Sequence, residues 1–492
     1  MATNTPNATS GLDRWFHISE RGSNISTEVR GGLVTFVTMA YIVVLNPLII
    51  GTVPDKYGNL ITGDPISNPA NIGTSIVVVS AATALIAGVM SILMGVFGRF
   101  PVALAAGLGL NGFLAFTIAP QMSWPEALGL MIIGGALMFV LVLTGFRLAV
   151  FRAVPEPLKY SIGAGIGLFI ALIGLTDAGV VRTGVPLITF AVFGQLAGWP
   201  IFTFVFGLLL IMVLVALRVR GGILIGLLVT TVLAVVVEAV AKVGPMKDAT
   251  GKVTNPTGWG LNVPKLPEKI VDFTNPSGLW HINLTGGIQA VGVVSAIVLI
   301  FSLLLSDFFD SIGTVTGLAA EGDLLQEDGE IEHIREILVV DSIAVMAGAA
   351  GGTSSNTAYI ESASGVGDGA RTGIASIVTG VMFILALFLA PLTKMVPYEA
   401  ATPALVVVGF LMFTQIRKIP MDDYAMAIPC FLTIILMPFT YSITNGVGAG
   451  LVSYVLIKVC QRKFSEISVI MWIISLAFVA YFAINPISQL IG

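Results

Sequence analysis

The chain has 492 residues, of which 56% are hydrophobic and 11% are charged, and its formal net charge is −4 at pH 7. An ordinary soluble domain has about 25% charged residues, and the mean hydropathy of +0.95 is too high for a water-exposed surface. These values exclude a soluble globular protein, a disordered chain and a fibrous repeat. The sequence also has no basic stripe of the kind that meets phosphates, so no nucleic-acid partner is expected.

Apolar stretches long enough to cross a bilayer, about 20 residues each, recur along the whole chain. A polar stretch at 242–288 divides them into two sets. The seven apolar stretches before it cover 31–50, 73–97, 101–119, 125–146, 160–177, 198–217 and 221–241. Seven more follow it, at 289–320, 337–351, 353–369, 372–396, 401–416, 424–441 and 443–460, and a last hydrophobic segment covers 468–490. This pattern predicts an all-α polytopic membrane protein.

An odd number of segments in the first half makes the second half enter the membrane from the opposite side, which is typical of inverted repeats in transporters. The third and tenth segments hold equivalent places in the two halves. Both are short and interrupted, at Ala105–Gly112 and at Gly351–Thr357. Such paired, broken segments indicate the binding site of a transporter.

Lysine and arginine predict the orientation. With the N-terminus inside, 16 of the 24 cations fall on inside segments, Arg147 and Arg152 among them, and 8 fall outside. The positive-inside rule then places the N-terminus and the acidic stretch 321–336 in the cytoplasm, and 242–288 outside. Residues 1–30 are polar, so no cleavable signal peptide is expected. Segment 468–490 either spans the membrane or lies along the bundle.

Carboxylates inside apolar segments are costly and are candidates for function. Asp307 and Asp310 lie three residues apart, so they share one helical face, and two like charges at that spacing repel each other. The pair either caps neighbouring backbone or accepts N–H groups from a polar ligand.

Glu361 follows the polar stretch 353–357, where an extended piece would pass into a half-helix. Burial favours the protonated form of such a carboxyl, which suits a group that takes up a proton during transport. Asn111 holds the corresponding place in the first half, where it either satisfies the broken backbone or bridges to Glu361 or to ligand. Asp341 and Asp368 lie near segment ends and are interpreted as structural, and the i, i+3 spacing predicts that Asp368 pairs with Arg371.

Motifs for catalysis and cofactor binding are missing. The three histidines, His17, His281 and His333, fall in predicted loops, so no histidine relay lies in the membrane. Zinc-hydrolase, nucleophile-elbow and phosphate-loop patterns are absent, and Cys430 and Cys460 lack metal or redox spacing. We therefore expect no cofactor, no metal, no enzyme activity and no ATP-driven transport.

Three stretches carry a family resemblance: Thr38–Pro47 in the first segment, Ser306–Thr314 in the eighth, and Glu361–Gly373 after the tenth. They resemble the AzgA-like branch of the nucleobase–cation symporters, which comprises hypoxanthine, adenine and guanine permeases. The resemblance extends from about Gly11 to the fourteenth segment. The Glu361 motif is long and specific.

The resemblance implies fourteen segments in two inverted repeats, with a short strand in segments 3 and 10. It implies a core domain, a gate domain and connecting segments. These cover 1–30 (N-terminal tail), 31–146 (core), 147–241 (gate), 242–288 (linker), 289–396 (core), 397–460 (gate) and 461–492 (C-terminal segment).

By position, the resemblance makes Asp307 and Glu361 the principal purine contacts, and these two carboxylates also the proton-coupling groups. Asp310 has a supporting role and Asn111 is their partner on segment 3. Thr353, in the polar stretch before Glu361, is a further candidate for substrate binding. Phe113, Phe308 or Tyr359 would provide the ring contact.

The function implied is proton symport of hypoxanthine, guanine and adenine by alternating access, in the inner membrane of a bacterium. The partners are the purine, the proton and the lipid bilayer; the oligomeric state stays open, a homodimer included. The eighth segment lacks the histidine of uracil-transporting relatives. The alternatives are an anion transporter or channel of the sulfate-permease type, a membrane-embedded enzyme, and a purine sensor.

Overall fold

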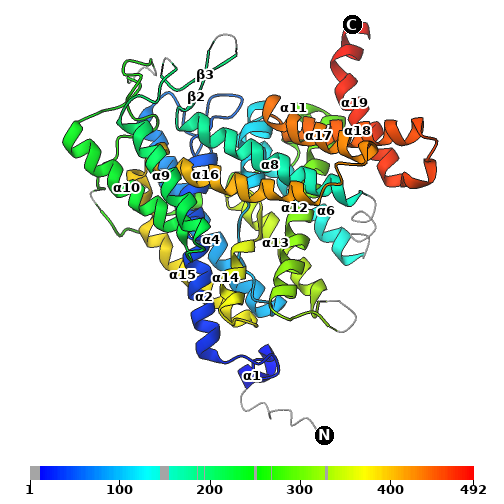
Figure 1. The fold of residues 1–492 in the computed structure, drawn as a ribbon, viewed down its shortest axis with the longest axis horizontal. Coiled ribbons are helices and arrows are strands. Elements are labelled where there is room, and N and C mark those ends of the chain that lie inside the picture. Colours follow the sequence, from blue (N-terminus) through cyan, green and yellow to red (C-terminus); the bar gives the residue numbers. More distant parts are fainter. Residues whose placement is uncertain are drawn as a thin grey trace.

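The computed structural model describes residues 11–144, 154–184, 187–192, 194–248, 252–267, 269–326 and 331–491. It is mainly helical, with two pairs of very short strands (Figure 1). The helices are α1 (Gly11–Phe16), α2 (Ile25–Met39), α3 (Ile42–Ile50), α4 (Pro69–Leu93), α5 (Leu108–Phe113), α6 (Trp124–Leu143), α8 (Glu156–Asp177), α9 (Trp199–Ala216), α10 (Gly222–Ala241), α11 (Gly286–Val291), α12 (Val293–Glu321), α13 (Ile334–Ala350), α14 (Ala363–Gly367), α15 (Gly373–Ala386), α16 (Tyr398–Phe413), α17 (Tyr424–Phe439), α18 (Ile443–Cys460) and α19 (Val469–Ile491). The strands are β1 (Leu104–Ala106), β2 (Val181–Thr183), β3 (Ile188–Phe190) and β4 (Asn356–Ala358).

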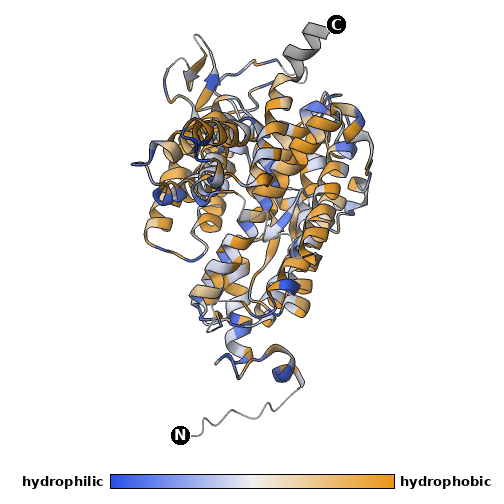
Figure 2. Ribbon diagram, turned by 90° about the vertical axis from the view of Figure 1, so that its right-hand side faces the viewer, coloured by the Kyte–Doolittle hydropathy of each residue, from blue (hydrophilic) through white to orange (hydrophobic). Residues whose placement is uncertain are grey.

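All fourteen predicted segments have a counterpart in these elements. Within the described ranges, ten helices are long and apolar enough to cross a membrane. Apolar residues cover most of the helical ribbon (Figure 2), and large apolar side chains such as Val232 and Val240 on α10 are exposed, as is expected of a lipid-facing helix. The protein is therefore a multi-pass membrane protein.

The third and tenth segments are broken, as predicted, and each contains a strand. β1 and β4 pair antiparallel, with Leu104 opposite Ala358 and Ala106 opposite Asn356. Backbone inside a membrane must find its hydrogen bonds within the protein, and the two strands satisfy part of this need for each other. Side chains supply more, because Ser91 Oγ accepts from the Leu104 N–H at 2.9 Å and donates to the Leu104 carbonyl at 3.1 Å.

The helices fall into two groups by their most extensive contacts. The first group contains α2–α6 and α12–α15, in which α15 packs on α2 and α4, and α13 packs on α6. The second group contains α8–α10 and α16–α18, in which α16 packs on α8 and α9, and α17 packs on α8 and α18.

The contact between α8 and α16 is close because of two glycines. A Cβ at Gly167 would lie 2.5 Å from the Gly409 carbonyl oxygen, and a Cβ at Gly409 would lie 2.4 Å from that of Gly167. Small residues allow such close helix packing in membrane proteins. These two helices are equivalent segments of the two halves, so the two repeats contact each other here through equivalent helices.

One face of the molecule, here called the N-terminal face, holds α1 and the residues on both sides of 327–330 (bottom of Figure 1). There, Arg21 pairs with Glu332 at 2.7 Å and donates to the Arg99 carbonyl at 2.9 Å. The opposite face, here called the linker face, holds loop 51–68, the β2–β3 hairpin and the long linker (top of Figure 1). The N-terminal helix and the residues on both sides of 327–330 thus lie at one face and the linker at the other; Arg147 and Arg152 lie outside the described residues.

The prediction that Asp368 pairs with Arg371 is wrong. Arg30 Nε donates to Asp368 Oδ2 at 2.5 Å, and Arg220 pairs with Oδ1, while the Arg371 guanidinium donates to the Val366 carbonyl at 2.6 Å. Burial alone would raise the pKa of the Asp368 carboxyl, but the hydrogen bonds from Arg220 and Arg30 outweigh it and the pKa lies below its ordinary value. Partners from α2 and from the turn before α10 therefore override the local spacing.

Candidate functional site

The two broken segments meet in the middle of the first helix group, and Glu361 lies directly after β4. The Tyr41 hydroxyl donates a hydrogen bond to Glu361 Oε1. The Thr38 hydroxyl oxygen, which is 2.8 Å from the Thr35 carbonyl of its own helix, also lies 3.3 Å from the Glu361 backbone carbonyl oxygen. Tyr41 and Thr38 both come from the first segment. The Glu361 side chain remains half-buried, so it is held in place on one side and accessible on the other.

Asp310 on α12 is exposed although it lies within an apolar spanning helix. It lies close enough to Glu361 to interact with it electrostatically, and both interact with Tyr359. The Glu361 and Asp310 carboxylates therefore lie near enough to interact beside the broken segments, and Asp310 also interacts with Asp341. A neutral ligand with N–H groups on two edges could bridge Glu361 and Asp310, and hydrogen bonds to a carboxylate are about twice as strong as those between neutral groups.

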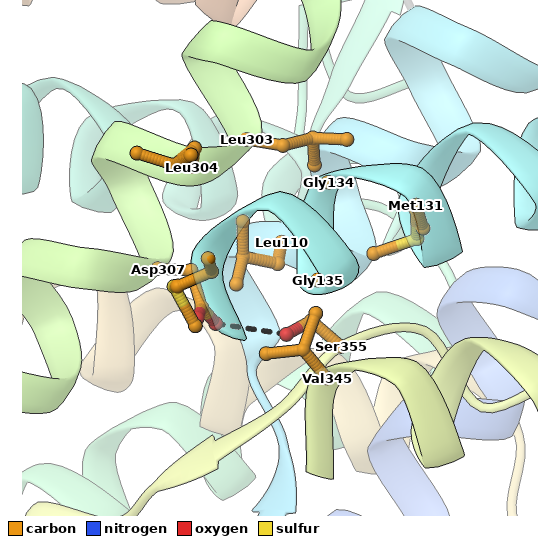
Figure 3. A pocket seen from close by; sticks show the side chains of 10 residues that line it. Leu110, Met131, Gly134, Gly135, Leu303, Leu304, Asp307, Val345 and Ser355 are labelled. Atoms are coloured by element: carbon orange, nitrogen blue, oxygen red, sulfur yellow. Dashed lines mark hydrogen bonds between the residues drawn. The ribbon is translucent and has the colours of Figure 1, made fainter. Parts of the chain in front are cut away.

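Asp307 is placed differently. Its side chain is 3% exposed and its Oδ1 accepts a hydrogen bond from the Ser355 hydroxyl at 2.8 Å, drawn as a dashed line in Figure 3. The pocket beside it, lined also by Leu110, Met131 and Val345, has a volume of about 10 Å³. Such a volume holds about one water molecule, and it is too small for a purine.

A third acid belongs to the same layer. Asp341 on α13 is buried and accepts from the Ser311 hydroxyl at 2.8 Å, and Ser311 is 2.7 Å from the Thr357 hydroxyl of β4. Asp307 and Asp341 therefore hold the chain at β4 through hydroxyl groups. The structural role expected of Asp341 fits this network.

Asn111 is completely buried on α5, and neither side-chain atom has a hydrogen-bond partner among the described residues. A buried amide without partners costs about 1–3 kcal/mol. The amide is thus not used to satisfy the broken backbone of its own segment, which was one of its two interpretations. It is left able to bind ligand or water.

The remaining candidates are buried and take part in packing or backbone satisfaction. The Tyr359 hydroxyl donates to the Ala106 carbonyl at 2.7 Å, and the Thr353 hydroxyl donates to the Gly348 carbonyl at 3.1 Å. Phe308 packs with residues of α6 and α13, and Phe113 is 1% exposed in the main core. Among them, Tyr359 interacts electrostatically with both Glu361 and Asp310.

Two residues of this layer were missed by sequence reasoning. Tyr41 and Ser355 both lie in stretches that had been singled out, Thr38–Pro47 and Gly351–Thr357. The signal was therefore present, but only the fold shows that Tyr41 meets Glu361 and that Ser355 meets Asp307.

Two halves of seven segments, joined at paired broken segments with carboxylates beside them, define a polytopic membrane transporter of the inverted-repeat class. Murine Slc26a9, described as an anion transporter in the inward-facing state, has a similar fold, with a TM-score of 0.57 at 12% identity over 88% of this chain and 68% of that one. The predicted fold class is confirmed.

The chain belongs to the permease family Xan_ur_permease, whose sequence model matches residues 26–449. It is 36% identical to the guanine/hypoxanthine permease PbuG of Bacillus subtilis over 96% of this chain and 99% of the relative. It is 33% identical to the adenine permease AdeQ of Escherichia coli over 96% of both. The resemblance to purine permeases is thus confirmed, and the protein is a transporter rather than an enzyme.

We predict that Ser355→Ala destabilises the protein by about 1–3 kcal/mol, because it removes a hydroxyl donor from a buried carboxylate. Thermal unfolding of the purified protein in detergent measures the effect. Ser354→Ala is the matched control, since the adjacent Ser354 hydroxyl is equally buried and has no hydrogen-bond partner among the described residues. Equal stability of the two variants would contradict a role for the bond between Ser355 and Asp307.

Proposed function

We propose that this protein imports purine nucleobases (hypoxanthine, guanine and adenine) by proton symport. The observation that carries the proposal is the pair of carboxylates, Glu361 of a broken segment and Asp310 of α12 beside it, in a chain so similar to purine permeases. A purine is flat and neutral, with N–H donors along its edges, so two carboxylates can each accept from it.

The structure leads us to change the expected ranking of the two α12 acids. Asp310 is exposed and interacts with Glu361, whereas Asp307 is 3% exposed and bonded to Ser355. We therefore propose Glu361 and Asp310 as the principal purine contacts, with Tyr359 and Asn111 beside them. Asp307 would position β4, and Thr353 and Phe308 would support the same layer.

Glu361 is the proposed proton carrier. A proton that moves through 100 mV releases about 2.3 kcal/mol, and about 1.4 kcal/mol corresponds to a tenfold concentration ratio. One proton per purine would therefore support roughly fortyfold accumulation per 100 mV. Alternating access would come from motion of the second helix group, the proposed gate domain, against the first, the proposed core domain.

The second candidate function, anion transport, rests on the fold alone, because the Slc26a9 likeness is at 12% identity. An anion site needs positive charge. Within the described part of the chain, the electrostatic partners of Asp310 are the acids Glu361 and Asp341. Two carboxylates at the broken segments favour a neutral or cationic substrate.

Selectivity is the first prediction of this proposal. Unlabelled hypoxanthine, guanine and adenine should compete with labelled hypoxanthine for uptake into vesicles with an imposed pH gradient, whereas uracil and xanthine should compete poorly. Uracil has only one ring to span the two carboxylates, and the eighth segment has no histidine. Strong competition by uracil at the hypoxanthine concentration would refute the purine assignment.

Substitutions at the two carboxylates should have different effects on binding and on accumulation. Asp310→Asn should weaken purine binding in detergent roughly 10- to 150-fold, since it removes charge from a hydrogen bond that contributes about 1.5–3 kcal/mol. Glu361→Gln should keep partial binding but abolish pH-driven accumulation, because Gln mimics the neutral acid and cannot release a proton. Asp307→Asn is the matched control, with its main effect on stability.

Two results would count against these roles. If Asp307→Asn weakens purine binding while Asp310→Asn does not, Asp307 and not Asp310 contacts the purine. If Glu361→Gln still concentrates purine, the coupling proton is carried elsewhere.

We further propose that the N-terminal face is cytoplasmic and that the protein lies in the inner membrane of a bacterium. In a variant without native cysteines, Leu266→Cys in the linker should react with an impermeant reagent added to intact cells, because its side chain is 71% exposed on the linker face. Leu325→Cys, 40% exposed on the N-terminal face, should react only after permeabilisation. The reverse pattern would invert the proposed orientation.

A further inference from the structure

A second pair of acids lies far from the broken segments, at the linker face. Asp177 is the last residue of α8, and Glu399 is in the first turn of α16. The Gly260 backbone of the linker lies between them: a Cβ on Gly260 would be 3.2 Å from Glu399 Oε1 and 3.6 Å from the Asp177 carbonyl oxygen. The two carboxylates interact electrostatically.

Glu399 is unusually buried for an acid, with 1% of its surface exposed. Its Oε1 accepts the Gly260 N–H at 2.9 Å, but its Oε2 is buried without a hydrogen-bond partner among the described residues. Arg182 of β2 is the cation that interacts with Glu399. One arginine for two neighbouring carboxylates leaves an excess negative charge in a site with little water, and this favours the binding of one proton.

Two contacts that join the two helix groups lie close to the acid pair. Tyr398, next to Glu399, donates its hydroxyl hydrogen to Thr52 Oγ1 at 2.8 Å, because the Thr52 hydroxyl itself donates to the Leu48 carbonyl at 2.8 Å. Thr52 follows α3 of the first group, whereas Tyr398 belongs to α16 of the second.

The second contact is aromatic. The Tyr441 ring lies 5.7 Å from Phe116, which belongs to the first group, and 5.2 Å from Phe169 of α8. Tyr441 also interacts electrostatically with Asp177. Each tyrosine thus contacts the first group and interacts electrostatically with Asp177. If the groups separate at this face, both tyrosines lose their contacts with the first group, and water can enter beside the carboxylates.

We propose that Asp177 and Glu399 form a second proton-binding site, and that a proton bound there favours closure of the linker face between the two helix groups. The groups that face this site are Asp177, Glu399, Arg182, Tyr398 and Tyr441. The closed form holds the Glu399 carboxylate away from water and so binds the proton more tightly. By linkage, a falling pH therefore shifts the population toward the closed form, by up to about tenfold per pH unit for a difference of one proton.

This inference rests on the proposed function in one respect, the relative motion of the two groups, and its test needs no purine. Spin labels at Tyr57→Cys and Phe439→Cys, in a variant without native cysteines, would report the distance between the groups at the linker face. Both positions are exposed, at 65% and 75%. Lowering the pH of the purified protein should enlarge the short-distance population.

Glu399→Gln should remove this pH dependence and keep the short distance populated, because the amide is permanently neutral. Asp177→Asn should move the transition to lower pH, since removing the neighbouring charge makes Glu399 easier to ionise. Glu399→Asp should retain a transition. Glu238→Gln is the matched control: Glu238 also binds the linker, through Trp259 Nε1 at 2.9 Å, and its variant should behave as the parent.

A transition that is absent from the parent, or unchanged in both Glu399→Gln and Asp177→Asn, would overturn the proposal. Glu361→Gln should keep the transition even though it loses proton-driven uptake. A failure of purine transport and a failure of this second site therefore give different results.

Discussion

Extended backbone in the middle of a membrane protein is the constraint on which the rest of this structure depends. Backbone N–H and C=O groups have no water there, so a broken helix survives only where the protein supplies partners. β1 is satisfied by β4 and by the hydroxyl groups of Ser91 and Tyr359, and Ser362 Oγ accepts from the preceding Ala103 N–H at 3.1 Å. Because β1 and β4 come from different halves of the chain, satisfying the backbone also joins the two repeats.

The acids of this layer differ in their hydrogen-bond partners and in their exposure. Asp307 and Asp341 each receive a hydroxyl hydrogen from a neighbouring segment and lie at 3% and 1% exposure. Glu361 accepts a hydrogen bond from the Tyr41 hydroxyl and is half-buried, whereas Asp310 is exposed. An acid that the fold satisfies internally holds the strands in place. An acid that it leaves accessible is available to a substrate or a proton.

The fold was largely predictable because spanning segments depend on length and hydropathy, which are local properties of the sequence. The site was less predictable, since it depends on partners distant in the chain. Spacing puts Asp307 and Asp310 on roughly one helical face and cannot say which of them meets Glu361. The Asp368–Arg371 pair failed for the same reason, because Arg30 and Arg220 arrive from other segments. Asp177 and Glu399 escaped notice because acids at segment ends usually face water.

The contacts between the two helix groups include polar and aromatic ones beside the apolar packing of the shared main core. Inside the second group, Gly167 and Gly409 bring α8 and α16 so close that a single added carbon would collide with backbone, and close packing of this kind resists deformation. Between the groups lie a hydroxyl–hydroxyl bond, a set of edge-on aromatic rings and the pairing of Arg220 with Asp368. Such contacts can break and re-form without disturbing either interior. Motion is therefore expected along this boundary, and the ionisable groups beside it can bias that motion, since a change in their charge alters one conformation more than the other.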